Sequence, residues 1–207
     1  MMFHVKQFQE LTGVTEATLG RLHVYAVLLE KWQKKINLVG PATIPDLWQR
    51  HMMDSAQLYP QLPRSCCEIM DFGSGAGFPG LVLAIMGGPR VTLVESDGRK
   101  CAFLAEVMRA CETGPAVRLE NRRIEDLQSA QADVVTSRAL APLDKLLGFA
   151  EPFLGKGSVC LFLKGKKADE ELTDAGKNWM MRVSKIQSLT DTSGAILKLE
   201  NIVRRDG

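Results

Sequence analysis

The sequence predicts an α/β protein with a Rossmann-like, mostly parallel seven-stranded sheet, a C-terminal antiparallel hairpin and an N-terminal helical extension. Three observations support this prediction. At residues 69–86 a short apolar segment runs into a glycine-rich turn and then a second apolar segment. From residue 68 onward, strand-like and helix-like segments alternate, which indicates a parallel sheet with helices on both faces. Near the end of the chain, two extended segments flank a Thr-Asp-Thr-Ser-Gly turn and predict the hairpin.

The N-terminal part is expected to be entirely helical. We assign residues 1–62 to a helical extension and residues 63–207 to the domain that contains the sheet. Thr15 can cap a long helix, because apolar residues recur every three or four positions after it as far as Ile36. A further helix is expected over about residues 44–59, and two prolines then mark the linker to the sheet.

The sheet domain follows in a regular order. The expected strands lie at about residues 68–72, 90–95, 116–121, 133–137, 158–164, 183–189 and 195–203. The helices between them are expected at about residues 80–86, 98–111, 124–127, 143–153 and 168–180. An antiparallel ending of this kind does not fit the two-halved dinucleotide-binding fold.

The glycine-rich turn after the first strand fits two known patterns. One is the acidic-x-G-x-G-x-G pattern of class I S-adenosylmethionine (SAM) methyltransferases, formed by Asp71, Gly73, Gly75 and Gly77. The other is the G-x-G-x-x-G pattern of dinucleotide enzymes, formed by Gly75, Gly77 and Gly80. Glycines allow positive φ and let a ligand approach the backbone. Asp71 favours SAM, because a carboxylate would repel a pyrophosphate but can help to hold an ammonium group, directly or through water.

Two further stretches fit a nucleoside ligand. Glu95 ends the second strand, where an acid can accept hydrogen bonds from the ribose hydroxyls of either SAM or NAD. After the third strand, the backbone of Ile124 and Glu125 could hydrogen-bond an adenine ring while the Ile124 side chain packs on its face. A helix cap with solvated charges explains this second stretch equally well.

Cationic residues follow the third, fourth and fifth strands, at the edge where the carboxyl ends of parallel strands form a ligand crevice. Arg138 ends the fourth strand. An N6-adenine or N4-cytosine methyltransferase would have an Asn/Asp-Pro-Pro-aromatic motif here to bind the exocyclic amine of its target base, and this motif is absent. We therefore expect Arg138 to contact phosphate, a guanine edge or the cofactor carboxylate. A basic rim that binds an RNA or DNA backbone is expected from Arg122, Arg123, Lys164, Lys166 and Lys167. Any single lysine is better explained as a solvated side chain.

Composition sets broader limits. With 207 residues, 45% of them hydrophobic and 24% charged, the chain suits one globular domain with an appendage. A net charge of +2 neither requires nor excludes a nucleic-acid partner. The five cysteines form no C-x-x-C or zinc spacing, so we expect reduced thiols and no metal. There is no signal-peptide core and no apolar run of about 20 residues, so we expect a cytoplasmic protein without a membrane partner. A monomer is expected, since no apolar stripe is left over for a partner.

Several motifs occur in one order along nearly the whole chain and together resemble one family. They are Asn37-Leu38, Arg50-His51-x-x-Asp54-Ser55, the turn from Asp71 to Gly80, Lys100-x-x-Phe103-Leu104, Ser137-Arg138-Ala139 and Lys164-Gly165. The sequence resembles the bacterial small-subunit (16S) ribosomal RNA guanine-N7 methyltransferases, also called glucose-inhibited division protein B. The Gly-Phe-Pro-Gly and Ser-Arg-Ala elements are specific to that family.

The resemblance implies a class I methyltransferase fold, SAM as methyl donor, and ribosomal RNA or the small ribosomal subunit as substrate, with one guanine of the decoding region as target. By position, the implied cofactor contacts are Gly73, Phe78, the Ile124–Glu125 backbone and Arg138. Two residues, Arg122 and Arg123, compete for one arginine position of the family. Ile124 departs from the small residue that the family often has there.

A guanine N7 atom has a lone pair and no proton, so its methylation needs no general base. We therefore expect Arg138, the one residue assigned to catalysis, to orient cofactor and RNA. The main rival is an NAD(P)-dependent oxidoreductase, but no Tyr-x-x-x-Lys hydride site is evident and the sheet ending does not fit. A third alternative is a SAM-binding or RNA-binding module without catalytic activity.

Overall fold

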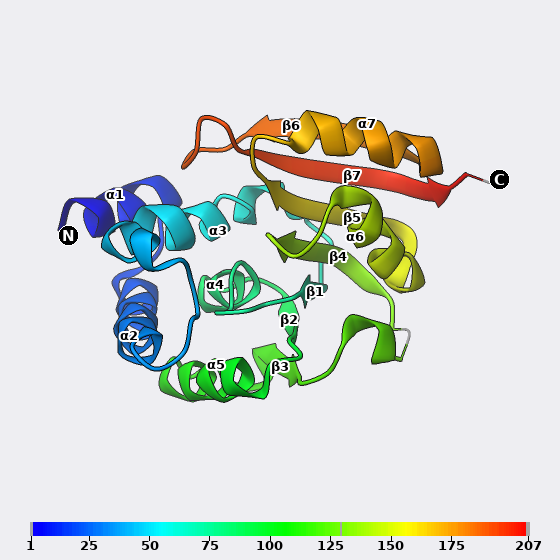
Figure 1. Ribbon diagram of the computed structural model, residues 1–207. Helices are drawn as coiled ribbons and strands as arrows, with labels where there is room; N and C mark the ends of the chain where they lie inside the picture. The colour runs from blue at the N-terminus through cyan, green and yellow to red at the C-terminus, as the bar shows by residue number, and fades with distance from the viewer. Residues whose placement is uncertain (1, 129, 206–207) are drawn as a thin grey trace.

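The computed structural model describes residues 2–128 and 130–205, with side chains from residue 5 onward. Its central sheet has seven strands in the order β3-β2-β1-β4-β5-β7-β6, as Figure 1 shows. The first five strands are parallel, whereas β7 runs antiparallel to β5 and β6 antiparallel to β7. The predicted fold class, including the antiparallel ending, is confirmed.

The elements alternate as the sequence indicates. The strands are β1 Glu68–Phe72, β2 Arg90–Val94, β3 Val117–Glu120, β4 Ala132–Arg138, β5 Leu154–Lys164, β6 Trp179–Gln187 and β7 Ala195–Arg204. The helices are α1 Met2–Thr12, α2 Glu16–Gln33, α3 Asp54–Ala56, α4 Gly80–Ile85, α5 Gly98–Ala110, α6 Leu143–Ala150 and α7 Ala168–Asn178.

Strand β1 is where the order of the sheet reverses. It pairs in parallel with β2 on one side and with β4 on the other. The chain therefore builds outward in both directions from β1, and the helices that follow β1 and β4, α4 and α6, pack on opposite faces of the sheet. In open α/β sheets such a point leaves a crevice outside the carboxyl ends of the strands, and ligands bind there.

Apolar side chains cover both faces of the sheet. Along β1, Ile69 belongs to the core cluster shared with α2, α4 and α5, whereas Met70 and Phe72 belong to the cluster shared with α6 and α7. This alternation follows from the two-residue repeat of a strand. Figure 1 shows the resulting layers, with the helices of residues 1–62 beside α4 and α5.

The N-terminal extension packs on the sheet domain through the apolar stripe of α2. The side chain of Thr15 accepts a hydrogen bond from the Thr18 amide at 3.2 Å and so caps α2, as predicted. Tyr25 is fully buried against Phe103 of α5, with 6.2 Å between ring centroids. Further along α2, the Trp32 indole donates to Glu106 at 2.9 Å.

The helix expected over residues 44–59 is interrupted, which corrects the prediction. Pro41–Asp46 forms 3-10 turns with Pro45 inside them, and Trp48–Met53 forms a π-helical turn that continues into α3. Proline has no amide hydrogen and cannot complete a regular α-helical ladder. Wide turns of the π type are often found at functional sites.

The hairpin is longer at its start than predicted. Strand β6 begins at Trp179, where an extension of α7 to residue 180 was expected, because Trp179 and Met180 pair with Arg204 and Val203 of β7. Strand β5 also begins earlier, at Leu154. Long-range pairing decides both boundaries, and local helical or turn propensity does not report it.

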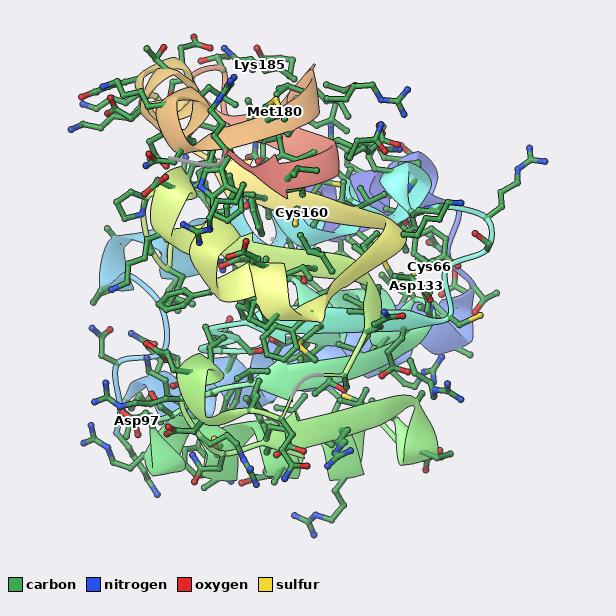
Figure 2. The ribbon with its side chains drawn as sticks, turned by 90° about the vertical axis from the view of Figure 1, so that its right-hand side faces the viewer. Cys66, Asp97, Asp133, Cys160, Met180 and Lys185 are labelled. Atoms are coloured by element: carbon green, nitrogen blue, oxygen red, sulfur yellow. The ribbon has the colours of Figure 1, made fainter. Side chains whose placement is uncertain are left out.

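The amino ends and the carboxyl ends of the parallel strands have different polar residues. Asp133, at the start of β4, accepts hydrogen bonds from the amides of Cys67 and Glu68 at 2.7 and 3.0 Å. Figure 2 shows Asp133 with Cys66 at one end of the strands and Asp97 at the other, after β2. Asp133 therefore lies away from the carboxyl-end crevice. Among the described helices, none combines the length and apolar character needed to cross a membrane.

Candidate functional site

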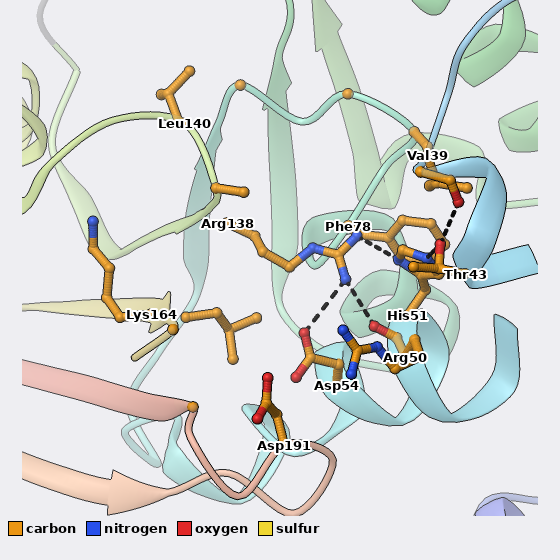
Figure 3. A pocket seen from close by; sticks show the side chains of 18 of the residues that line it. Val39, Thr43, Arg50, His51, Asp54, Phe78, Arg138, Leu140, Lys164 and Asp191 are labelled. Carbon is orange, nitrogen blue, oxygen red and sulfur yellow. Dashed lines mark hydrogen bonds and ion pairs between the residues drawn. The ribbon is translucent and has the colours of Figure 1, made fainter. Parts of the chain in front are cut away.

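A cavity of about 760 Å³ opens at the carboxyl ends of the strands. Five segments contribute most of its border: the glycine loop after β1, the loop after β4, residues 38–54 of the N-terminal extension, the end of β5 with the loop after it, and the loop between β6 and β7. Figure 3 shows Arg138 in the middle of this site. Segments from both ends of the chain therefore meet at the crevice that the sheet order creates.

The three alternating glycines serve different purposes. All of them have positive φ, with values of 62° at Gly73, 59° at Gly75 and 94° at Gly77. A Cβ added at Gly75 would meet only the Gly73 carbonyl, at 3.7 Å, so Gly75 faces open space. At Gly73 it would lie 2.7 Å from Leu140, and at Gly77 2.6 Å from the Tyr25 hydroxyl. Gly77 therefore permits packing in the core, whereas Gly75 is the glycine that leaves room for a ligand.

Asp71 is fully buried beneath this loop. Its carboxylate accepts hydrogen bonds from the Thr136 hydroxyl at 2.7 Å and from the Gly80 amide at 3.3 Å. Burial raises the pKa of Asp71 to about 6, against the opposing effect of hydrogen bonds from Thr136, Ser74 and Gly80. Asp71 was predicted to help to hold an ammonium group, directly or through water; its burial does not favour the direct contact, and the contact through water stays a prediction. Asp71 ties the start of α4 to β4 and so shapes the loop from below.

Glu95 also holds the glycine loop. One of its carboxylate oxygens accepts from the Gly75 amide and the other from the Asp97 amide, both at 2.8 Å. The side chain is 8% exposed. An ionised carboxylate has about four acceptor positions, so these two bonds leave capacity for a ligand hydroxyl. The predicted ribose contact of Glu95 stays a prediction, beside a structural role that the sequence did not reveal.

Phe78 forms the inner side of the cavity. Its ring stacks on Tyr25, with centroids 5.3 Å apart, and on His51, with centroids 5.1 Å apart. The guanidinium carbon of Arg138 lies 4.8 Å from the same ring centroid. Tyr25 also donates a hydrogen bond to the carbonyl of Ala76 in the glycine loop. Helix α2 therefore fixes both the glycine loop and the ring of Phe78 through Tyr25.

Arg138 is held by the N-terminal extension. Its guanidinium donates to His51 Nδ1 at 2.9 Å, to the Arg50 carbonyl at 3.2 Å and to Asp54 at 3.4 Å. The side chain is 18% exposed. Charge-assisted bonds in several directions fix both the position and the plane of a guanidinium. His51 and Asp54, which lie about one turn apart in the N-terminal extension, thus both hold Arg138.

These contacts determine the tautomer of His51. A guanidinium has no acceptor, so Nδ1 must accept from Arg138 and Nε2 carries the proton. Nε2 then donates to the Thr43 hydroxyl at 2.6 Å, and that hydroxyl donates to the Gly40 carbonyl at 2.7 Å. Burial, which is the largest cause, and the charges of Arg138 and Arg50 together lower the pKa of His51 to about 3. His51 is therefore neutral near pH 7.

Asp54 extends the same network to the β6–β7 loop. Its Oδ1 accepts from the Thr190 hydroxyl at 2.7 Å and from the Gln57 amide group at 2.9 Å. Gln57 in turn accepts from the Leu189 amide at 2.8 Å. We call Arg138, His51, Thr43, Asp54 and Thr190 the Arg138 network. It joins the end of β4, the N-terminal extension and the C-terminal hairpin.

The predicted basic rim is only partly present. Lys164 lies in the cavity wall with a side chain 8% exposed, where it pairs with Glu171 at 2.7 Å and donates to the Ala141 carbonyl at 2.7 Å. These two bonds use two of the three N–H donors of the ammonium group and do not favour the predicted RNA contact of Lys164, which stays a prediction. Lys166 and Lys167 are exposed just beyond it. They are separated by several strands from the arginines after β3.

The segment after β3 has a mixed character. Arg122 is paired with Glu120 at 3.1 Å, whereas Arg123 is exposed and forms no ion pair with any described residue. The Ile124 side chain is 8% exposed and packs in the core cluster on the α6 side. Glu125 is exposed. The buried Ile124 side chain anchors this turn and leaves its backbone at the carboxyl edge of the sheet.

Several residues of the site were not anticipated from the sequence. Thr43, Leu140, Asp191 and Thr190 all border the cavity or join its network. Thr190 and Asp191 belong to a Thr-Asp-Thr-Ser-Gly stretch that is typical of an exposed turn. Nothing in such a turn indicates that it folds back on the far end of the chain.

Comparison with known proteins identifies the family. The family described as rRNA small subunit methyltransferase G (GidB) matches residues 18–199. The chain is 57% identical over 193 residues to ribosomal RNA small subunit methyltransferase G of Paramagnetospirillum magneticum, covering 93% of each chain. It is 50% identical to the protein of the same name from Rhodospirillum centenum, covering 98% of this chain and 93% of the relative.

Solved structures support the fold. A SAM-dependent methyltransferase from Aquifex aeolicus matches with a TM-score of 0.59 and 15% identity, covering 78% of this chain and 98% of that one. P. horikoshii TYW2 in complex with MeSAdo matches with a TM-score of 0.58 and 17% identity, covering 83% and 65%. At such identities the likeness concerns the fold alone. With a family match over most of its length and relatives at 50% identity or more, this chain belongs to the rRNA small subunit methyltransferase G family.

Proposed function

We propose that this protein transfers a methyl group from SAM to N7 of one guanine in the decoding region of 16S ribosomal RNA. The observation that carries the proposal is the position of Gly75, whose missing side chain leaves open space in the same cavity that contains Arg138. The family supplies the reaction class and the RNA. The positive φ and open face of the glycine loop fit a ligand that lies directly on the backbone.

The cofactor contacts follow from this position. We assign SAM to the glycine loop, with Gly73 and Gly75 beneath it and Glu95 beside its ribose. The backbone of Ile124 and Glu125 would receive the adenine, and Phe78 and Arg138 would border the methionine end. SAM supplies an electrophilic methyl group when it is bound. The residues of this chain position the reactants and exclude water.

The neutral state of His51 agrees with this chemistry. A guanine N7 atom has no proton to remove, so the site needs no base, and the hydrogen bonds of His51 hold Arg138 in place. Positive charge moves from the donor sulfur to the base during transfer. Arg138 therefore serves orientation, and Asp54 offsets its charge at 3.4 Å.

We assign RNA contacts to the exposed cations that follow β3 and β5, namely Arg123, Lys166 and Lys167. Arg123 is favoured over Arg122 because Arg122 is already paired with Glu120. The substrate would be ribosomal RNA or the small ribosomal subunit in the cytoplasm, and we expect the protein to act as a monomer.

Transfer of labelled methyl from SAM to small ribosomal subunits tests the proposal. We expect one methyl per subunit, recovered as 7-methylguanosine after nuclease digestion. A subunit with 7-deazaguanosine at the modified position should accept no label, because it lacks the attacking nitrogen. Label in any other nucleoside, or thermal stabilisation by NAD and not by SAM, would overturn the proposal.

A further inference from the structure

The β6–β7 loop places one carboxylate, Asp191, at the edge of the cavity. Figure 3 shows Asp191 on the opposite side of Arg138 from Leu140. Leu140 lies against Gly73, because a Cβ added to that glycine would be 2.7 Å from its side chain. The glycine loop and Leu140 therefore border one side of the cavity, and Asp191 borders the opposite side, with Arg138 between them.

Asp191 is held in a defined orientation. Its Oδ1 accepts from both the amide and the hydroxyl of Ser193 at 2.8 Å, and its carbonyl accepts from the Gly194 amide at 3.0 Å. The preceding residue, Thr190, is bonded to Asp54 at 2.7 Å. The loop is thus fixed relative to Arg138, and Asp191 with it. Its other oxygen, Oδ2, accepts no hydrogen bond from a described residue.

Asp191 differs from the other acids that border the cavity. Asp54 is paired with Arg138 at 3.4 Å, and Glu171 with Lys164 at 2.7 Å. Asp191 has no ion pair within the described residues. Hydrogen bonds from the hydroxyl and amide of Ser193 hold the pKa of its carboxyl below the usual value. An ionised acceptor is therefore available at the site.

Guanine has the complementary edge. N7 and O6 lie on one edge of the purine, whereas the N1–H and N2–H donors lie on the Watson–Crick edge, away from N7. A base whose N7 faces a methyl donor on the glycine loop turns these donors towards the opposite side of the cavity. We propose that Asp191 is the specificity-determining residue for guanine, and that its carboxylate accepts from N1–H and N2–H of the target base. This inference rests on the proposed function.

The same contact favours the reaction. Methylation at N7 leaves a positive charge on the base and makes its N1–H a stronger donor. An anionic acceptor on that edge therefore interacts more strongly with the product-like transition state than with neutral guanine, which is the condition for raising kcat. Adenine has an acceptor at N1 and no amino group at C2, so it would place a lone pair against the carboxylate.

The test compares guanosine with inosine at the target position of the small subunit, because inosine lacks only the N2 amino group. For the wild-type protein we expect kcat/KM about tenfold to a hundredfold higher with guanosine, as for a hydrogen bond to a charged group. In Asp191→Asn, an amide N–H can stand where Oδ2 stood. We expect kcat/KM with guanosine to fall at least about tenfold and the guanosine preference to shrink to within about threefold.

The matched control is Asp174→Asn, which removes the same charge from exposed α7, where Asp174 pairs with Lys177. It should behave as wild type, and SAM affinity should be unchanged in both variants. If Asp191 were only a surface charge, its removal would strengthen RNA binding and leave the guanosine preference intact. That result would overturn the inference while the proposed function stands. Failure of the wild-type protein to methylate guanosine at all would overturn the proposed function instead.

Discussion

The glycine-loop side of the cavity and the Arg138 network are held by contacts of very different range along the chain. In the glycine loop, Asp71 binds an amide nine residues away and Glu95 binds one 20 residues away. In the Arg138 network, Asp54 contacts Arg138 over 84 residues and Thr190 over 136. The glycine loop thus takes its shortest-range supports from two consecutive strand–helix units, with Tyr25 and Thr136 added from 51 and 65 residues away, whereas Asp54 links segments 84 and 136 residues apart.

This difference suggests a division of tasks. The glycine loop is a short-range turn whose main-chain conformation receives the cofactor. The Arg138 network exists only when the N-terminal extension and the C-terminal hairpin are both docked on the sheet, so it can present Arg138 only in the complete fold. Changes to the loop should therefore affect cofactor binding, and changes to the network should affect transfer.

The largest effect is expected at Gly75. A side chain there would project into the cavity, so Gly75→Val should weaken SAM binding more than about a hundredfold, which corresponds to about 2.7 kcal/mol. Isothermal titration calorimetry measures this directly. Gly75→Ala is the control for backbone strain. Both variants place a side chain at a positive φ, but alanine adds only one carbon to the cavity, so the difference in SAM affinity between them measures the effect of side-chain size.

Gly77→Ala provides the contrast within the same loop. Its Cβ would lie 2.6 Å from the Tyr25 hydroxyl, in the core. We expect a loss of unfolding free energy of about 2 kcal/mol from overpacking and from the strain of a side chain at φ 94°, with SAM affinity of the folded protein nearly unchanged. Normal SAM affinity in Gly75→Val would contradict the assignment of the loop.

Arg138→Ala should have the next largest effect. It removes the guanidinium but leaves Asp54 bonded to Thr190 and Gln57, so the protein should still fold. We expect kcat/KM for methyl transfer to fall by about a hundredfold or more, as for the loss of an orienting group. Circular dichroism checks the fold, and Arg138→Lys, which keeps charge but not geometry, should recover only part of the activity. Turnover equal to wild type would reject the role of Arg138.

The two sides should also respond to pH with opposite signs. His51 has a pKa of about 3 in the fold and 6.5 as a free group, so the unfolded chain binds more protons between these values and stability falls as pH is lowered. Asp71 has a pKa of about 6 in the fold against 3.8, so the native state binds more protons there and stability rises as pH is lowered. Near pH 5 each contribution amounts to about 1 to 2 kcal/mol, and the two largely offset.

Urea unfolding at pH 7.5 and pH 5 separates these contributions. Relative to wild type, His51→Gln should gain stability on acidification and Asp71→Asn should lose it, each by about 1 to 2 kcal/mol. Groups common to all three proteins cancel in this comparison. Parallel pH dependences in the three proteins would show that neither group titrates as the structure indicates.

The smallest effects are expected at the exposed cations. Arg123→Gln and Lys167→Gln should each weaken RNA binding about threefold near physiological salt. Each should also reduce the slope of the logarithm of the binding constant against the logarithm of salt concentration by about one. Lys164→Met should instead lower stability by about 1 to 2 kcal/mol, because it leaves Glu171 without its buried partner. Fluorescence anisotropy at several salt concentrations measures RNA affinity and its salt dependence. If Lys164→Met lowered the salt dependence of RNA binding as much as Lys167→Gln does, the placement of Lys164 as a structural residue would be contradicted.

Much of the fold could be predicted because its signals are short in range. The strand pattern, the turn after β1 and the cap at Thr15 are all set by residues a few positions apart. The predicted helix over residues 44–59 was wrong in its interior, because Pro45 and the packing of the following π-helical turn override its apolar pattern. The start of β6 was wrong because pairing with β7 decides it.

The sequence alone therefore determined the class of fold, the glycine turn and the placement of Arg138 at a strand end, since periodicity and turn chemistry are local properties of the chain. Only the tertiary structure decided that Asp71 lies under the loop and that Lys164 is paired inside the wall. It also decided that His51 is a neutral support for Arg138 and that the hairpin turn closes the site. The contacts of His51 with Arg138 and of Thr190 with Asp54 join side chains more than 80 residues apart, and those of Asp71 and Lys164 join neighbouring strands and loops, so all of them are set by packing of the whole chain.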